Sequence, residues 1–227
     1  MSENKKLLKY TGILFLLVLL TYPMPYHSKS IIEYFIRPIG TNGGRLYVSG
    51  LVPLALFVIA IRGLFKLERF QDRSKILIFI AVILIVIPIM QWTVDVGRTT
   101  FHRVSGHQLQ AVDFVEGDIS LFSSEEEVTI HSSLTVKDYG RGQNRFYIRL
   151  HLPESLQQVT GQEYYDFEQE YLTQGHRREK VIKKQFTVSR DEIGESVDFH
   201  GIRWHGEDIE YTLYNDGQAV TLTNHGW

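Results

Sequence analysis

Hydrophobic positions follow two different patterns along the chain. In the first part they form three long runs, and from about residue 109 onward they alternate with polar positions. A continuous apolar run of about twenty residues is typical of a helix that crosses a membrane, whereas alternation is typical of a strand with one buried face. The pattern therefore predicts a membrane domain at residues 1–96 and a β domain at residues 97–227.

The apolar runs predict three transmembrane helices, near residues 10–26, 46–65 and 76–96. The first run follows three lysines and could be a signal peptide, but no small-residue cleavage motif comes after it. We therefore expect it to stay in the protein as a span that ends with interfacial aromatic residues. The third run is the clearest, because residues 76–90 contain no charged or polar side chain.

Basic residues near the ends of these runs predict the orientation. Residues 1–9 and 62–75 together carry eight lysines and arginines, whereas residues 27–45 and the stretch just after the third run carry five. Positive residues are retained on the cytoplasmic side. We therefore expect a cytoplasmic amino terminus and an extracytoplasmic domain at residues 97–227.

Charge and composition refine this localisation. Residues 1–96 contain 11 basic and 5 acidic residues, and residues 97–227 contain 13 and 21, so the halves carry net charges of +6 and −8. The apolar runs exclude a wholly soluble protein and a disordered chain. The chain has no cysteine and no Asn-x-Ser/Thr sequon, so neither disulfides nor a glycosylating secretory path is indicated. A bacterial plasma membrane fits best.

Alternation and turn residues predict short strands in the second half. An Asp216-Gly217 turn between two alternating runs is a strong hairpin signature. The predicted strands cover residues 128–136, 146–152, 181–188, 197–204, 209–214 and 219–223. Short strands with frequent turns in about 130 residues favour an antiparallel β-sandwich of immunoglobulin-like size, with one short helix.

The segment from Gly161 to Gly175 has a different spacing. Tyr164, Phe167 and Tyr171 fall at i, i+3 and i+7, with acidic residues between them. This spacing predicts a short helix with its aromatic side chains on one face. Such a helix would pack over one end of the sandwich or form an aromatic recognition surface.

A basic run follows that segment directly and stands out in an acidic domain. It is explained either by the exposed face of a strand or by contact with an anionic envelope polymer or lipid headgroups. The residues that we select as candidate ligand or partner contacts are Arg177, Arg178, Lys183, Lys184, Tyr164 and Tyr171.

The sequence offers no motif for catalysis, metal binding or a cofactor. Cysteine nucleophiles are excluded, and no Gly-x-Ser-x-Gly elbow or Ser-x-x-Lys pair occurs. His200 and His205, near Glu207 and Asp208, are five residues apart and would point to opposite faces of a strand. An acidic, outward domain also argues against nucleic-acid binding. We therefore expect no enzymatic activity.

These features favour a multi-pass membrane protein that displays an extracytoplasmic binding or sensing module. Its expected partners are the lipid bilayer and either an anionic envelope polymer or a membrane protein. The apolar connection at residues 31–39 could dock such a protein, which leaves an accessory subunit of a transporter or channel as an alternative. An envelope enzyme with a site assembled in space is a further alternative.

Overall fold

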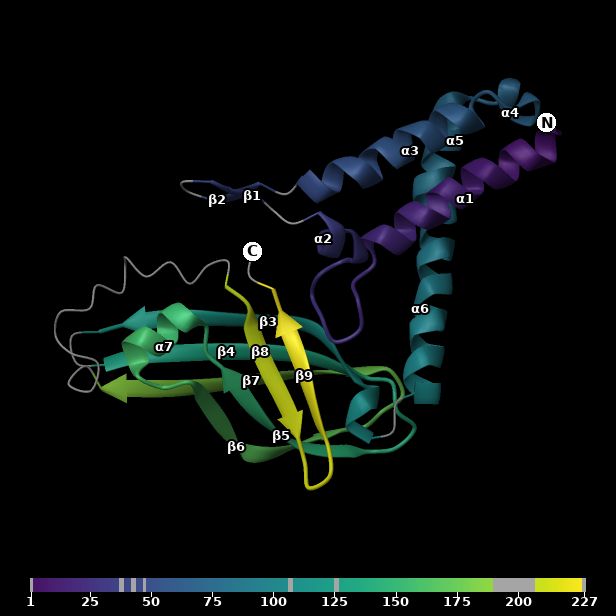
Figure 1. Cartoon of the computed structure of the whole chain (residues 1–227). Helices are drawn as coiled ribbons and strands as arrows, with labels where there is room; N and C mark the ends of the chain where they lie inside the picture. The colour runs from purple at the N-terminus through teal and green to yellow at the C-terminus, as the bar shows by residue number, and fades with distance from the viewer. Residues whose placement is uncertain are drawn as a thin grey trace. The chain divides into compact units, whose positions relative to one another are not determined.

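The computed structural model describes residues 2–36, 39–41, 44–46, 48–105, 108–124, 127–189 and 207–225 (Figure 1). The chain divides into two compact units. The first, helical unit comprises Met1–Met24 and Lys29–Arg98, and the second, β unit comprises Pro25–Ser28 and Thr99–Trp227. The β unit thus contains a short piece of the connection that follows the first helix.

Most of the helical unit is α-helix. Its elements are α1 (Glu3–Thr21), α2 (Ile31–Phe35), β1 (Ile39–Thr41), β2 (Gly44–Leu46), η1 (Val48–Gly50), α3 (Leu51–Leu64), α4 (Glu68–Gln71), α5 (Lys75–Ala81), the π-helical segment η2 (Val82–Val86) and α6 (Ile87–Ser105). Pro88 has no N–H to donate to the carbonyl four residues earlier, and the π-helical turns lie directly before it. The last residues of α6 belong to the β unit.

One helix of the described residues, Lys75–Val104, is long and apolar enough to cross a membrane. It contains the third predicted span. The helix Val48–Leu64 is apolar but shorter, and α1 is not among the helices that meet the criteria for length and hydropathy. The first two spans therefore stay predictions.

The helices of this unit pack through apolar side chains. Leu14 and Val18 of α1 and Ile61 and Leu64 of α3 share a buried cluster with residues of η2 and α6. Gly63 makes the contact between α1 and α3 close, because any Cβ at this position would overlap the ring of Tyr10. Many other large apolar side chains of the unit are exposed, including Leu54, Ile59, Leu77, Ile80, Leu84 and Ile89. Such a surface suits a lipid solvent.

The β unit contains two antiparallel sheets (Figure 1). The three-stranded sheet has the order β3-β4-β7, and the four-stranded sheet has the order β6-β5-β8-β9. The strands are β3 (Val112–Ser123), β4 (Glu127–Asp138), β5 (Asn144–His151), β6 (Tyr164–Thr173), β7 (Arg178–Ser189), β8 (Ile209–Tyr214) and β9 (Ala219–Asn224), with η3 (Gln108–Ala111) and α7 (Glu154–Thr160) between them. One core cluster takes side chains from both sheets.

Alternation predicted five of these strands because each has one buried face. In β5, Phe146, Ile148 and Leu150 are fully buried while the intervening residues are more exposed. The predicted strands at residues 128–136, 146–152, 181–188, 209–214 and 219–223 are confirmed. The predicted strand at residues 197–204 lies outside the described residues.

The hairpin between β8 and β9 closes through the side chain of Asn215. The predicted hairpin is confirmed, because β8 and β9 pair antiparallel up to Tyr214 and Ala219, although Gly217 is not among the residues with positive φ. The side chain of Asn215 instead accepts hydrogen bonds from the backbone N–H groups of Gly217 and Gln218, at 3.2 and 3.0 Å. An asparagine that caps its own turn in this way does not need a left-handed glycine.

The helix predicted between Gly161 and Gly175 is wrong, because this segment forms strand β6. Phe146 and Ile148 of β5 pair with Tyr171 and Phe167, so a bulge inserts extra residues in β6. The bulge places two buried aromatic residues four positions apart, which is also the spacing of a helix. Helix α7 was not predicted, and it is capped at its carboxyl end by Gly161, where a φ of 64° favours glycine.

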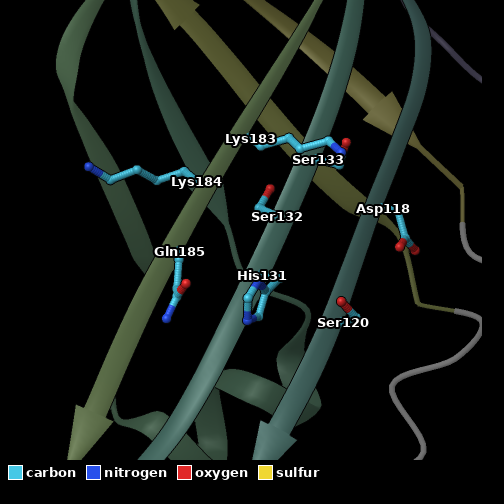
Figure 2. Close-up of a pocket in the computed structure, with 8 residues that line it drawn as sticks. All are labelled: Asp118, Ser120, His131, Ser132, Ser133, Lys183, Lys184 and Gln185. Carbon is cyan, nitrogen blue, oxygen red and sulfur yellow. The ribbon is translucent and has the colours of Figure 1, made fainter.

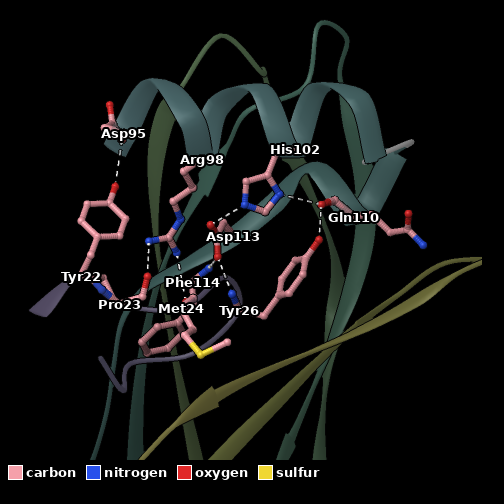
Figure 3. A network of polar contacts seen from close by, with 10 residues as sticks. All are labelled: Tyr22, Pro23, Met24, Tyr26, Asp95, Arg98, His102, Gln110, Asp113 and Phe114. Atoms are coloured by element: carbon pink, nitrogen blue, oxygen red, sulfur yellow. Dashed lines mark hydrogen bonds and ion pairs between the residues drawn. The ribbon is translucent and has the colours of Figure 1, made fainter. Parts of the chain in front are cut away.

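Polar contacts hold residues of the first connection within the β unit (Figure 3). The backbone N–H of Tyr26 donates to Asp113 Oδ1 at 2.7 Å, and its hydroxyl donates to the Gln110 carbonyl at 2.6 Å. Thr223 donates its N–H to the Tyr26 carbonyl and accepts from the N–H of Ser28. Residues 26–28 therefore cover the free edge of β9, which would otherwise be open to pairing with another chain.

His102 completes this cluster from the last turns of α6. It is fully buried, with Nε2 2.6 Å from Asp113 Oδ2 and Nδ1 3.1 Å from the Gln110 carbonyl. The ring stacks on Tyr139 at 4.9 Å between centroids. The end of α6 is thereby a packed part of the β unit.

Candidate functional site

A groove lies on the three-stranded sheet of the β unit (Figure 2). It has a volume of about 450 Å³. Its lining residues, which come from β3, β4 and β7, are Asp118, Ser120, His131, Ser132, Ser133, Lys183, Lys184 and Gln185. All eight are polar or charged, so the groove can offer hydrogen bonds and charge to a ligand.

Strand register explains which of these side chains share a face. Asp118, Ser133 and Lys183 pair in one row across the three strands. Ser120, His131 and Gln185 form another row, two residues away along each strand. Residues directly opposite, and residues two apart, point to the same side of a sheet. The two rows therefore form one polar surface.

The row between them faces the core. Ile119 and Ser132 of this row are buried, at 1% and 2% exposure, and Ser132 Oγ is hydrogen-bonded to the Tyr211 hydroxyl at 3.0 Å. Lys184 occupies the same row on the edge strand β7, where its side chain is partly buried. In Figure 2 the side chains of Lys183 and Lys184 point away from each other.

The groove has a basic character. Two lysines and His131 outnumber the single carboxylate of Asp118. In the part of the chain that the structure describes, neither lysine forms an ion pair, so both ammonium groups are available to a ligand. The ring of Phe122, 61% exposed, meets His131 edge to face at 4.9 Å and extends the surface beyond the groove.

The six candidate contact residues do not form one site. Lys183 and Lys184 line the groove, whereas Arg177 and Arg178 lie where β7 begins. There Arg177 donates its N–H to the Asp138 carbonyl at 2.7 Å, and Arg178 Nη1 donates to Gln174 at 2.6 Å. Both arginines thus take part in the turn between β6 and β7.

The two tyrosines of that set are separated by the alternation of β6. Tyr171 is 8% exposed and belongs to the core, where burial raises the pKa of its phenol. Tyr164 is 41% exposed on the outer face of the four-stranded sheet. A helix would have placed them together, but the strand does not.

A second polar surface surrounds Tyr164, on the four-stranded sheet. Arg149 Nε and Nη2 donate to the two oxygens of Asp166 at 2.8 and 2.9 Å, and the guanidinium carbon lies 4.0 Å from the Tyr164 ring centroid. Tyr214 donates its hydroxyl to Asp166 at 3.4 Å. These polar groups therefore satisfy one another within the sheet.

The ionisation of this surface follows from the bidentate pair. The hydrogen bonds from Arg149 lower the pKa of Asp166 and raise that of Arg149 in return. Burial, with the carboxylate of Asp166 second, raises the pKa of the Tyr214 phenol. Tyr147, Arg149 and His151 alternate with the buried residues of β5, but they were not among the selected candidate residues. An arginine between an aromatic residue and a histidine on one strand face was the signal in the sequence that could have indicated this surface.

The histidine and carboxylate cluster near residue 205 provides no metal site that the structure describes. His200 and His205 lie outside the described residues. Glu207 accepts a hydrogen bond from the Ser155 N–H at 3.1 Å, and Asp208 pairs with His225 at 2.8 Å. Within the described residues, no three histidine or acidic side chains form a group that could hold a metal ion.

No protein-family model matches this chain, and no curated protein matches it significantly.

Proposed function

We propose that this chain is a multi-pass bacterial plasma-membrane protein that displays a β-sandwich of immunoglobulin-like size outside the cell as a binding module. Three spans would anchor it, with the amino terminus in the cytoplasm, as the distribution of basic residues favours. The apolar helix Lys75–Val104 and the exposed apolar side chains of the helical unit support the anchor.

The observation that carries the binding role is the groove with its unpaired lysines. Exposed Lys183, with His131 and the partly buried Lys184 also lining the groove, suits a ligand with repeated negative charge, because each contact adds Coulomb attraction without burying a charge. We therefore propose an anionic envelope polymer as the ligand. Lysines on an edge strand also discourage pairing with other strands, and a binding role is compatible with that protection.

Binding is tested with the full chain in detergent and immobilised poly(glycerol phosphate). We expect Lys183→Ala to weaken binding about three- to tenfold and to reduce its salt dependence. Arg178→Ala is the matched control, because it removes the same charge from the same strand outside the groove. An equal loss in both variants would show a general charge effect and would contradict the groove as the site.

Topology is tested with single cysteines, since the chain has none of its own. The two variants are Asp216→Cys and Gln71→Cys. Asp216 lies in the exposed turn after β8, and Gln71 is exposed at the end of α4. A membrane-impermeant thiol reagent on intact cells should label position 216 and not position 71. The reverse result would place the β unit in the cytoplasm and end the proposal of an envelope ligand.

A second candidate function is that of an accessory subunit for another membrane protein. Phe35 and Tyr34 of α2 are 78% and 44% exposed in the helical unit. Large exposed aromatic side chains are typical of contact surfaces. Stable co-purification with one larger membrane protein, lost on Phe35→Ala, would favour this role over polymer binding.

A further inference from the structure

The groove on the three-stranded sheet carries charge of both signs, although a purely anionic ligand would use only one of them. Asp118 lies on β3 and Lys183 on β7, and Ser133 of the central strand β4 pairs with both of them in one row. Neighbouring strands are about 4.8 Å apart, so the backbones that carry the two charges are separated by about 10 Å. The carboxylate and the ammonium group are thus supplied from opposite sides of one groove.

Both charged groups are open to a ligand. Asp118 and Lys183 are exposed, and among the described residues no side chain forms an ion pair with either of them. Outside the strand ladder, Asp118 accepts one hydrogen bond, from the Tyr211 hydroxyl to its backbone carbonyl at 3.3 Å. In Figure 2 the side chain of Lys183 extends over β4 toward Ser133, and Asp118 lies on the next strand. The carboxylate can therefore pair with a cation that a ligand brings.

A ligand with negative charge alone would be opposed by Asp118. A phosphate that contacts Lys183 and Ser133 lies one strand spacing from the strand of Asp118, where like charges repel each other. A positive group in the same ligand would remove this repulsion and add an ion pair. The charges of the groove therefore fit a ligand that carries both signs.

We propose that the groove binds a phosphodiester polymer in which some repeat units carry a primary ammonium group, such as poly(glycerol phosphate) esterified with an amino acid. This inference rests on the proposed binding role of the groove and names the charge pattern of its ligand. The phosphate contacts Lys183 and accepts a hydrogen bond from Ser133, while the ammonium group pairs with Asp118. The row that contains His131 and Gln185 lies about 7 Å further along the strands and offers donors to the next unit.

The alternative is that Asp118 only protects the strand at the end of the sheet. A charged side chain on such a strand discourages pairing with other chains. If this were its only role, binding would follow the net negative charge of the polymer, and an ammonium ester would weaken it. The two explanations therefore predict opposite effects of the ester.

The test compares three forms of immobilised poly(glycerol phosphate) on the full chain in detergent, at about pH 6, where an α-amino group is protonated. One form is unesterified, one carries alanine on a minority of its hydroxyls, and one carries N-acetylalanine at the same density. We expect the alanine form to bind about three- to fivefold more tightly than either of the others, the size of a partly exposed ion pair. The N-acetyl form keeps the bulk of the ester without the ammonium group, so it separates charge from simple contact.

Asp118→Asn should abolish the preference for the alanine form and strengthen binding of the unesterified form. It removes the charge but keeps the shape of the side chain and the backbone contact with Tyr211. Glu116→Gln is the matched control, because Glu116 is an exposed acid two residues away on the same face of β3, outside the groove lining. This variant should keep the preference.

Three results would overturn the paired-charge site and leave the anionic-polymer groove in place. These are an alanine form that binds no more tightly than the other two, a preference that survives in Asp118→Asn, and a preference that is lost equally in Glu116→Gln. If none of the three forms binds the chain, the proposed binding role itself fails, and the paired-charge site fails with it.

Discussion

The outer faces of the two sheets differ in how their charged side chains are satisfied. On the four-stranded sheet, Arg149 is bound in two places by Asp166 and covers the ring of Tyr164. On the three-stranded sheet, Lys183 forms no ion pair with the rest of the described chain. A charge that is already paired adds to stability, whereas an unpaired charge is available to a ligand. We therefore expect the first face to contribute to stability, and we propose the second as the binding face.

The largest effect is expected where the two sheets are joined, at the buried carboxylate of Asp138. This residue of β4 accepts hydrogen bonds from Asn144, Thr173 and the N–H groups of Gly140 and Gly175, at 2.5–3.1 Å. Asp138→Ala leaves four buried or partly buried donors without their acceptor. We expect it to lower the free energy of unfolding by about 3 kcal/mol, measured by urea denaturation of the chain in detergent.

Thr173→Val is the matched control for Asp138→Ala, because it removes one donor of the four and keeps the shape of the side chain. It should cost about 1 kcal/mol. Equal losses in the two variants would mean that the carboxylate itself contributes little. In that case the stability of the two sheets would not depend on the carboxylate of Asp138.

A smaller effect should separate the two faces directly. Arg149→Ala removes the partner of Asp166 and uncovers the ring of Tyr164, so we expect a loss of about 1 kcal/mol in the free energy of unfolding. Lys183→Ala should change stability by less than about 0.5 kcal/mol while it weakens polymer binding. If Lys183→Ala destabilises the chain as much as Arg149→Ala does, the two faces do not differ in their contribution to stability.

The sequence predicts those elements whose buried side chains recur at a regular spacing within one segment. Alternation predicted β4, β5 and β7 because each strand buries or partly buries every second side chain. The same rule failed for β6, where a bulge separates Phe167 from Tyr171 by four residues and imitates a helix. A bulge depends on the partner strand, so a single segment does not reveal it.

The candidate site was predictable only in part for a related reason. Lys183 and Lys184 stood out because they are basic in an acidic domain. Their neighbours in the groove, Asp118 and His131, come from strands more than 50 residues earlier, and only the register brings them together. Register is set by tertiary packing, which the period of one strand does not encode.

The smallest effect expected on the paired face is a pH dependence that belongs to this face alone. The hydrogen bonds from Arg149 hold the pKa of Asp166 below its ordinary value of 3.8. Because the folded-state pKa is the lower one, this pair stabilises the fold above the unfolded pKa, and the stabilisation is lost as the pH falls through the folded value. The Asp166 side chain is 37% exposed, so solvent screening should limit the loss to under about 1 kcal/mol.

Urea denaturation at pH 7 and pH 3 measures that loss. The wild-type chain should lose more stability than Asp166→Asn over this interval, since the variant has no carboxylate to protonate at this position. Glu168→Gln is the control, because Glu168 is an exposed acid on the same strand. If Glu168→Gln reduced the pH dependence as much as Asp166→Asn, the acid sensitivity would arise from the net charge of the domain. The paired face would then be no more sensitive to pH than the open one.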